Sequence, residues 1–125
     1  MKLTKYIATV CIALAIISCE NQTITSETKI AITQTVDGIT TSTFKVWGNC
    51  DMCKETIEGS LKVDGVIKAD WNTESKIITT SYDTTKITLN QLQKNIALVG
   101  YDNEAYKGDD AAYKALPECC QYERK

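Results

Sequence analysis

Two cysteines three positions apart, Cys50 and Cys53, are the residues of this sequence best suited to chemistry. They follow Gly48 and Asn49, between a run with strand-like alternation and a run with helix-like spacing. At a helix start, residues with this spacing lie on the same side of the first turn, so both sulfurs can reach one ion. Free backbone N–H groups and the positive end of the helix dipole favour thiolates there. The spacing therefore predicts a binding site for a soft metal ion.

The residue types in the chain limit which metals can bind and which kinds of site are possible. Thiolates favour copper(I), and mercury(II), silver(I) and zinc(II) also accept them. Two thiolates alone leave an ion open to attack by a partner's thiol, which suits transfer more than storage. The same spacing fits half of a structural zinc site, a redox pair or a disulfide. Because the chain contains no His, His-ligated zinc centres and Cys–His nucleophilic catalysis are excluded.

The first 18 residues have the pattern of an export signal. Two lysines precede an apolar run over residues 7–17, which is far shorter than the roughly 20 residues needed to span a bilayer. Residues 16–19, Ile-Ile-Ser-Cys, resemble the lipobox of bacterial lipoproteins. We therefore expect residues 1–18 to be a lipoprotein signal peptide and Cys19 to be acylated, anchoring the protein in a bacterial envelope membrane that faces the periplasm or the cell exterior. An ordinary cleaved signal with a chance Cys is the alternative.

Length and charge indicate one small, acidic domain. The 125 residues suffice for a single domain with a modest core. Lys and Arg number 14 against 16 Asp and Glu, so a nucleic-acid partner has no electrostatic basis. We also expect the protein to be a monomer. Of six cysteines, Cys11 leaves with the signal and Cys19 takes lipid. The remaining four could also form two disulfides in an oxidising compartment: Cys50, Cys53, Cys119 and Cys120.

The rest of the chain divides into three parts. Residues 19–40 are rich in Thr and Ser and predict a tether, although alternation at Ile30, Ile32 and Val36 could instead mark an added strand. Residues 41–106 carry the signals of a folded domain, and residues 107–125 form a Cys-containing tail. In the tail, Asp109 or Asp110 could cap a short helix over residues 111–116.

The sequence of residues 41–106 predicts elements in the order strand, helix, strand, strand, helix, strand. Alternation of Phe44 and Val46 predicts the first strand, which leads into the Cys loop. The first helix places Cys53 on the apolar face and leaves Cys50 more exposed. Residues 67, 69 and 71, and then residues 78, 80 and 82, alternate with their neighbours as in a hairpin.

A capping box of Thr88 and Gln91 begins the second helix, and Gly100 ends it. Residues 101–106 can supply a fourth strand. Two right-handed crossovers then give an α+β, ferredoxin-like βαββαβ fold, with a four-stranded antiparallel sheet and both helices on one face.

Four short motifs lie along residues 41–106: Cys50-x-x-Cys53, Asp64-Gly65-Val66, Tyr82-Asp83 and Gly100-Tyr101-Asp102. With these motifs the sequence resembles heavy-metal-associated domains, the fold of copper chaperones, copper-ATPase amino-terminal modules and periplasmic mercuric-ion binding proteins. The resemblance implies that the two cysteines of the loop bind the metal, that Tyr101 lies near it, and that the ion passes to a transporter or efflux partner by thiolate exchange.

The chain departs from this family just before the first Cys, where Gly-Met-Thr is usual and Trp47-Gly48-Asn49 stands here. The family's Met packs beneath the site, and its absence affects affinity and metal preference while the ligands remain. Trp47 or Met52 could fill the space by packing. In the tail, Cys119 or Cys120 could reach the site as an auxiliary ligand, or form a local or tail-to-loop disulfide.

Three functions follow from these residues. The leading hypothesis is a membrane-tethered module that binds and transfers a soft ion, copper(I) first and mercury(II) next, without catalysis. The second is a thiol-disulfide oxidoreductase in which Cys50 attacks and Cys53 resolves. Against it, the order of elements is not thioredoxin-like. The third is a surface lipoprotein held together by disulfides, with no metal.

Overall fold

The computed structural model describes residues 38–125, so the predicted signal peptide, Cys19 and nearly all of the predicted tether lie outside the described residues. Among residues 38–125, no helix is both long and apolar enough to cross a membrane. The elements are β1 (Ile39–Lys45), α1 (Asp51–Gly59), β2 (Val66–Trp71), β3 (Ile77–Asp83), α2 (Leu89–Leu98), α3 (Asp110–Ala115) and the 3-10 helix η1 (Glu118–Cys120).

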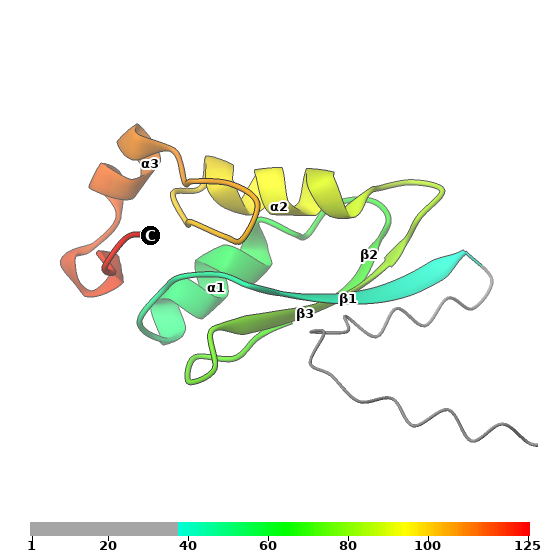
Figure 1. The fold of residues 1–125 in the computed structure, drawn as a ribbon, viewed down its shortest axis with the longest axis horizontal. Coiled ribbons are helices and arrows are strands. Elements are labelled where there is room, and N and C mark those ends of the chain that lie inside the picture. Colours follow the sequence, from blue (N-terminus) through cyan, green and yellow to red (C-terminus); the bar gives the residue numbers. More distant parts are fainter. Residues whose placement is uncertain (1–37) are drawn as a thin grey trace, which may run out of the picture.

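The sheet is antiparallel, with strand order β1-β3-β2 in the described part. Both α1 and α2 lie on one side of it (Figure 1). Phe44 of β1 and Trp71 of β2 both pair with Ile78 of β3, and all three side chains are buried. The predicted α+β class, antiparallel sheet and helix placement are confirmed.

Local sequence signals explain the boundaries of the elements. The Thr88 hydroxyl accepts from the Gln91 N–H and the Gln91 side chain reaches back to the Thr88 N–H, so the predicted capping box is present. Gly100 follows α2 with φ of 93°, a left-handed conformation that glycine adopts without steric cost. Asp109, one of the two predicted candidates, caps α3 by accepting from the Ala112 N–H. By contrast, β1 begins at Ile39, five residues before Phe44, the first residue named for the predicted strand.

The predicted fourth strand over residues 101–106 is wrong. In the described part, this segment makes a single antiparallel bridge with β1, between Asn103 and Val46. The Asn103 side-chain oxygen accepts from the N–H groups of Ala105 and Tyr106, at 3.1 and 3.0 Å, and so turns the chain back on itself. Local side-chain bonding of this kind competes with a sheet ladder, and here it leaves three strands.

The alternation predicted in β2 also fails at one residue. The register of the β2–β3 pair shifts between Val66 and Lys68, which marks a bulge. Ile67 lies at this shift and is 59% exposed, whereas Trp71 farther along the strand is fully buried. A bulge inserts an extra residue into one strand, so the next side chain points to the opposite face of the sheet. A regular alternation of side chains does not predict this change.

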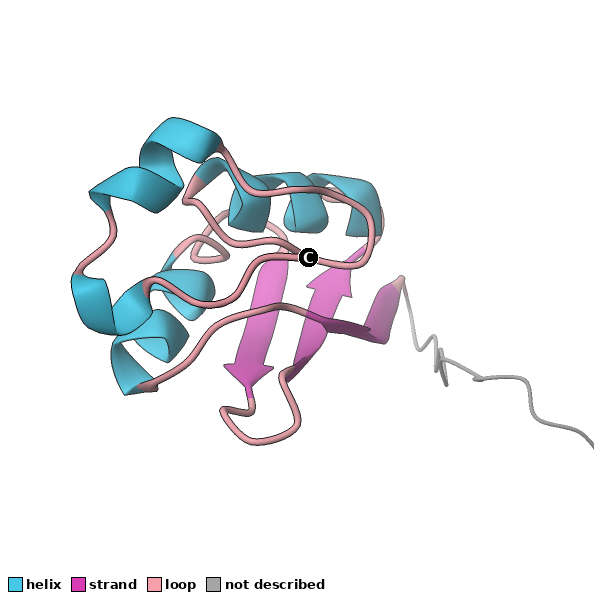
Figure 2. Cartoon of the chain, turned by 60° about the vertical axis from the view of Figure 1, so that its left-hand side comes forward, coloured by secondary structure: helices cyan, strands magenta, loops and turns pink. Residues whose placement is uncertain are grey.

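The tail is an integral part of the domain. After α3 the chain folds back toward the start of α1, and η1 contacts α1 (Figure 2). Cys120 and Tyr122 are buried to 1% and 3% exposure within the same hydrophobic core as the sheet and helices. The residues after 106 therefore complete the core, on the side of the molecule where Cys50 lies.

Candidate metal centre

The two cysteines of the loop occupy the first turn of α1. Cys50 is the N-cap, with an extended backbone (φ −137°, ψ −178°), and Cys53 lies within the helix. Their Sγ atoms are 3.7 Å apart. Cys53 is fully buried and Cys50 is half-buried, so the predicted difference in exposure is confirmed. Cys50 is therefore the more accessible of these two thiols.

The start of the helix favours negative charge on the Cys50 sulfur. The backbone N–H of Cys53 is the largest influence on the Cys50 thiol, and with the N–H of Met52 it lowers the pKa of Cys50 although burial opposes this. The Cys53 sulfur in turn accepts a hydrogen bond from the Asn49 N–H at 3.3 Å. Backbone N–H groups therefore favour the Cys50 thiolate without a neighbouring base.

Trp71 supports the loop from beneath, a role that the sequence did not reveal. Its indole Nε1–H donates to the carbonyl of Val46 at 3.1 Å. A Cβ atom built on Gly48 would lie only 3.0 Å from the Trp71 ring and 3.3 Å from the Cys53 Cβ. Gly48 thus lets the loop approach both side chains closely. The only signal in the sequence was a large aromatic residue at the end of a buried strand.

The two side chains expected to fill this space lie elsewhere. The Trp47 ring has the ammonium groups of Lys45 and Lys125 over it, at 4.8 and 5.6 Å from the ring centre. Met52 is 51% exposed on the first turn of α1. Its sulfur lies 3.6 Å from the Cys119 sulfur, on the tail side of the site. Neither residue packs in the position occupied by Trp71.

The tail brings two more thiols to the same place. The Cys120 sulfur lies 4.0 Å from the Cys50 sulfur and 3.8 Å from the Cys119 sulfur. The sulfurs of Cys50, Cys119 and Cys120 are all within 4.8 Å of one another. All four thiols, including Cys53, are free. Burial, above all other influences, raises the pKa of Cys120 to about 12, so that thiol is protonated at neutral pH.

Tyr101 lies at the buried side of the cluster. It is fully buried, and its hydroxyl has no hydrogen-bond partner among the described residues. Burial, followed by the neighbouring sulfurs of Cys53 and Cys120, raises its pKa far above the ordinary value. The phenol therefore stays neutral. The structure thus brings together the five site residues that the sequence singled out in the folded part and the tail: Cys50, Cys53, Tyr101, Cys119 and Cys120.

A buried ion pair holds the tail in this position. The Asp102 carboxylate is fully buried and accepts from the Arg124 Nη2 at 2.7 Å. The backbone N–H groups of Gly108 and Lys125 donate to it at 2.7 and 3.1 Å. Burial alone would raise the pKa of Asp102, but the Arg124 guanidinium and these N–H groups hold it below its ordinary value. We call the pair of Asp102 and Arg124 the tail latch.

Tyr122 adds a second attachment between the latch and the thiols. Its hydroxyl accepts from the Asp102 N–H at 2.7 Å and donates to the Gly100 carbonyl at 2.8 Å. Its ring stacks on Tyr101 at 5.6 Å and meets Tyr113 edge-on at 5.2 Å. These contacts fix the backbone two residues after Cys120. The position of that sulfur therefore depends on side chains that the pattern of the tail did not indicate.

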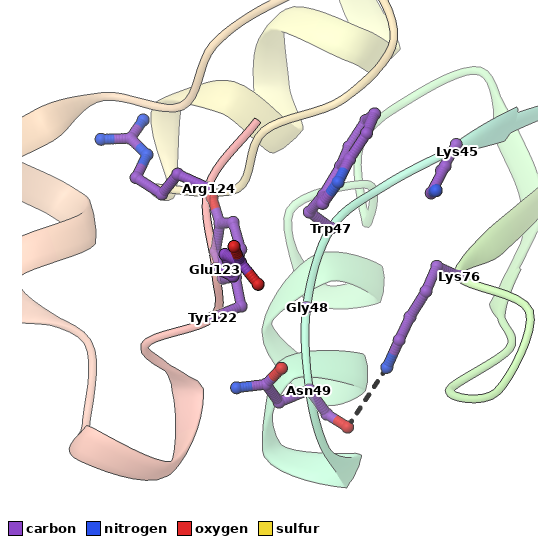
Figure 3. A pocket seen from close by; sticks show the side chains of 8 residues that line it. All are labelled: Lys45, Trp47, Gly48, Asn49, Lys76, Tyr122, Glu123 and Arg124. Carbon is purple, nitrogen blue, oxygen red and sulfur yellow. Dashed lines mark hydrogen bonds between the residues drawn. The ribbon is translucent and has the colours of Figure 1, made fainter.

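A polar hollow of about 390 Å³ separates the loop from the end of the tail. Figure 3 shows its walls, with Lys76 reaching toward the carbonyl of Asn49, to which its Nζ donates at 3.4 Å. None of the four thiols lines it, so it is distinct from the metal centre. The residues that line it are Lys45, Trp47, Gly48, Asn49, Lys76, Tyr122, Glu123 and Arg124.

The chain belongs to the family of heavy-metal-associated domains, whose model matches residues 43–102. It is 36% identical over 55 residues to the copper chaperone CopZ of Staphylococcus aureus, a match that covers 43% of this chain and 81% of the relative. Among solved structures, oxidized MerP from Ralstonia metallidurans is 31% identical, with a TM-score of 0.50, over 53% of this chain and 94% of that one.

A protein of Bacillus anthracis, described as a candidate copper-ion-binding protein, is 25% identical with a TM-score of 0.52. The match covers 55% of this chain and the whole of that protein. The family match ends at Asp102, the residue that anchors the tail. The tail and its two thiols therefore lie beyond the matched segment.

Proposed function

We propose that the protein binds a soft metal ion through Cys50 and Cys53 and transfers it, with copper(I) as the first cargo and mercury(II) as the next. The observation that carries the proposal is the pair of sulfurs 3.7 Å apart at a helix start. With metal–sulfur bonds of about 2.3 Å, two sulfurs of one ion lie roughly 3.8 Å apart at a tetrahedral angle and roughly 4.6 Å apart when the ion is linear, so the pair needs to open by at most about 1 Å to hold an ion. Copper is supported by the name of the Staphylococcus aureus relative.

Transfer to a partner is supported by the different exposure of the two thiols. Cys50 is half-buried and Cys53 fully buried, so a thiol of the partner can attack the ion from the Cys50 side while Cys53 still holds it. We infer that the partner is a metal transporter or efflux protein and that a monomer delivers the ion by thiolate exchange. The process forms and breaks metal–sulfur bonds only and requires no catalysis. Silver(I) and zinc(II) are competing cargoes of the same ligand chemistry.

We further propose that Cys19 is lipidated and tethers the domain to an envelope membrane facing the periplasm or the cell exterior. The support is the lipobox-like segment at residues 16–19. A Cys19→Ala variant is then expected to lose the acyl mass and its partitioning into detergent. Membrane association that is unchanged in this variant would show instead that a retained signal segment holds the protein.

The tail thiols serve as auxiliary ligands in this proposal. Cys120 is 4.0 Å from Cys50 and is held in the core, so it is the nearer of the two to a third metal–sulfur bond at the first ion. A third thiolate tightens binding and slows transfer. Under reducing conditions, Cys120→Ser is expected to weaken copper(I) binding without abolishing it, as measured by competition with a coloured chelator.

The central experiment is an anaerobic copper(I) competition titration of the reduced protein, followed by the same titration with zinc(II). Wild type is expected to bind copper(I) more tightly than zinc(II). The double variant Cys50→Ser, Cys53→Ser is expected to lose tight binding. Cys50→Ser alone tests the same point without altering the core, because Cys50 is only half-buried. Wild-type copper(I) affinity in both variants, with an intact fold by circular dichroism, would refute the proposal.

The same clustering of free thiols favours one alternative, thiol-disulfide exchange. Sulfurs 3.7 to 4.0 Å apart require only a short movement to form a bond, and Cys50 has the lowered pKa of an attacking thiol. An insulin-reduction assay distinguishes the two functions. Reduction that depends on Cys50 would favour the oxidoreductase. A fully reduced protein that binds no metal and reduces no insulin would favour the disulfide-held lipoprotein.

A further inference from the structure

The four thiols form two groups that meet at one sulfur. Cys50 pairs with Cys53 at 3.7 Å. Cys50 also belongs to the group of three sulfurs that all lie within 4.8 Å of one another, together with Cys119 and Cys120. Cys53 is not a member of that group. The sulfurs therefore surround two neighbouring positions that share Cys50.

Each group is complete enough to hold an ion. Around a single ion with bonds of about 2.3 Å, three sulfurs in a plane lie roughly 4.0 Å apart. The separations of 4.0 Å between Cys50 and Cys120 and of 3.8 Å between Cys119 and Cys120 fit this geometry. The second position also differs in access, since Cys119 is exposed whereas Cys53 is fully buried. One ion can thus be held at the buried pair and another at the surface.

The Met52 thioether indicates which metal the second position binds. Its thioether sulfur lies 3.6 Å from the Cys119 sulfur, and its side chain is half exposed beside the tail. Thioether sulfur is a soft ligand that suits copper(I), whereas zinc(II) sites in proteins use thiolate, imidazole and carboxylate. A thioether at this side of the thiol group therefore favours copper(I) over zinc(II).

We propose that Cys50, Cys119 and Cys120, with the Met52 thioether, form a second copper(I) centre that shares the Cys50 thiolate with the centre at Cys50 and Cys53. The inference rests on the proposed function. Each thiol that binds releases its proton to solvent and forms a copper–sulfur bond, and no electron is transferred. The second monovalent ion also neutralises one more thiolate charge. Two of the four sulfurs are buried, so this neutralisation lowers the free-energy cost of keeping charged thiolates in the protein interior.

The test is the copper(I) stoichiometry of the reduced full chain, measured anaerobically by native mass spectrometry and by X-ray absorption. Wild type is expected to carry a second ion, with copper–copper scattering and a monomer mass. Cys119→Ser, which changes an exposed residue, and the double variant Cys119→Ser, Cys120→Ser are expected to carry one ion without that scattering. Met52→Leu is expected to weaken the second ion roughly tenfold, at the low end for groups that support a metal site, and to leave zinc(II) binding unchanged. Ile67→Leu, an exposed apolar residue on β2, is the matched control.

The outcomes separate this inference from the proposed function. One ion in wild type, with three or four sulfur ligands and no copper–copper scattering, overturns the second centre and leaves the proposed function intact. A second ion that appears only with a dimer mass, and disappears on dilution, also overturns it. No copper(I) bound to wild type refutes the proposed function itself. Retention of both ions by the Cys119→Ser, Cys120→Ser variant shows that the tail thiols do not hold the second ion.

Discussion

Replacing Arg124 with Met tests whether the tail latch holds the domain together. The change removes the guanidinium donors to Asp102 and to Asp110 and leaves Asp102 with the N–H groups of Gly108 and Lys125. Breaking a buried ion pair from one side costs about 3 to 5 kcal/mol. We expect the low end, about 3 kcal/mol, because two backbone donors remain and the Arg124 side chain is 18% exposed. For a domain of this size, that loss corresponds to a fall in Tm of about 12 °C or more.

The loss is expected to depend on pH in one direction. The Asp102 pKa is lowered in the folded protein, so its stabilisation is complete above the unfolded value of about 3.9 and disappears as the pH falls through the folded pKa. Without Arg124, burial raises that pKa instead, and protonation relieves the buried charge. The difference in free energy of unfolding between wild type and variant is therefore largest near pH 7 and shrinks toward about pH 3.

The assay is urea unfolding at several pH values, followed by circular dichroism on reduced, metal-free protein. Lys62→Met is the control, because it removes an exposed cation that has no ion pair among the described residues. A loss in Arg124→Met below about 0.5 kcal/mol, the range of ordinary surface substitutions, would refute the latch. A large loss that is independent of pH would show that packing of the Arg124 side chain, and not its charge, is responsible.

Three further predictions use other features of the site. Gly48→Ala is expected to weaken copper(I) binding in a competition titration, because its Cβ would lie 3.0 Å from Trp71. The control is Gly59→Ala, where no atom lies within 4 Å of the new Cβ. Equal copper(I) affinities of the two variants would contradict the prediction. Gly100→Ala is expected to lower stability by at least about 1 to 2 kcal/mol in urea unfolding, since φ is positive and the Cβ would lie 2.7 Å from the Tyr113 nitrogen. Iodoacetamide at neutral pH is expected to label Cys50 before Cys120 in mass spectra, because the pKa of Cys50 is lowered and that of Cys120 is raised to about 12; earlier labelling of Cys120 would show that the tail opens readily.

The features that the sequence predicted depend on residues close together in the chain. The first turn of α1 needs only the spacing of Cys50 and Cys53, and α2 needs only the capping box and the glycine that follows it. The β2–β3 hairpin likewise follows from two alternating runs and a short turn. Each of these signals lies within a few residues, where helix and strand periods apply directly.

The features that the sequence missed depend on side chains that compete with a regular pattern or act across a long separation. Asn103 turns the chain where continued pairing would have made a fourth strand. Ile67 is exposed because the strand bulges beside it. The tail latch joins residues 22 positions apart, and neither Asp102 nor Arg124 signals a buried partner by its type. The choice between a tail ligand and a tail disulfide was left open by the sequence for the same reason.

The position of Trp71 gives the metal centre an optical signal of its own. The indole is fully buried, packs against the loop before Cys50 and lies near the Cβ atom of Cys53. Soft, heavy ions quench the fluorescence of an adjacent indole, so loading of Cys50 and Cys53 is expected to lower the fluorescence of Trp71. The other tryptophan, Trp47, has two ammonium groups near its ring, and a Trp47→Phe variant would leave Trp71 as the single tryptophan. Metal arrival and departure could then be followed in real time, without a dye or a label attached to the thiols.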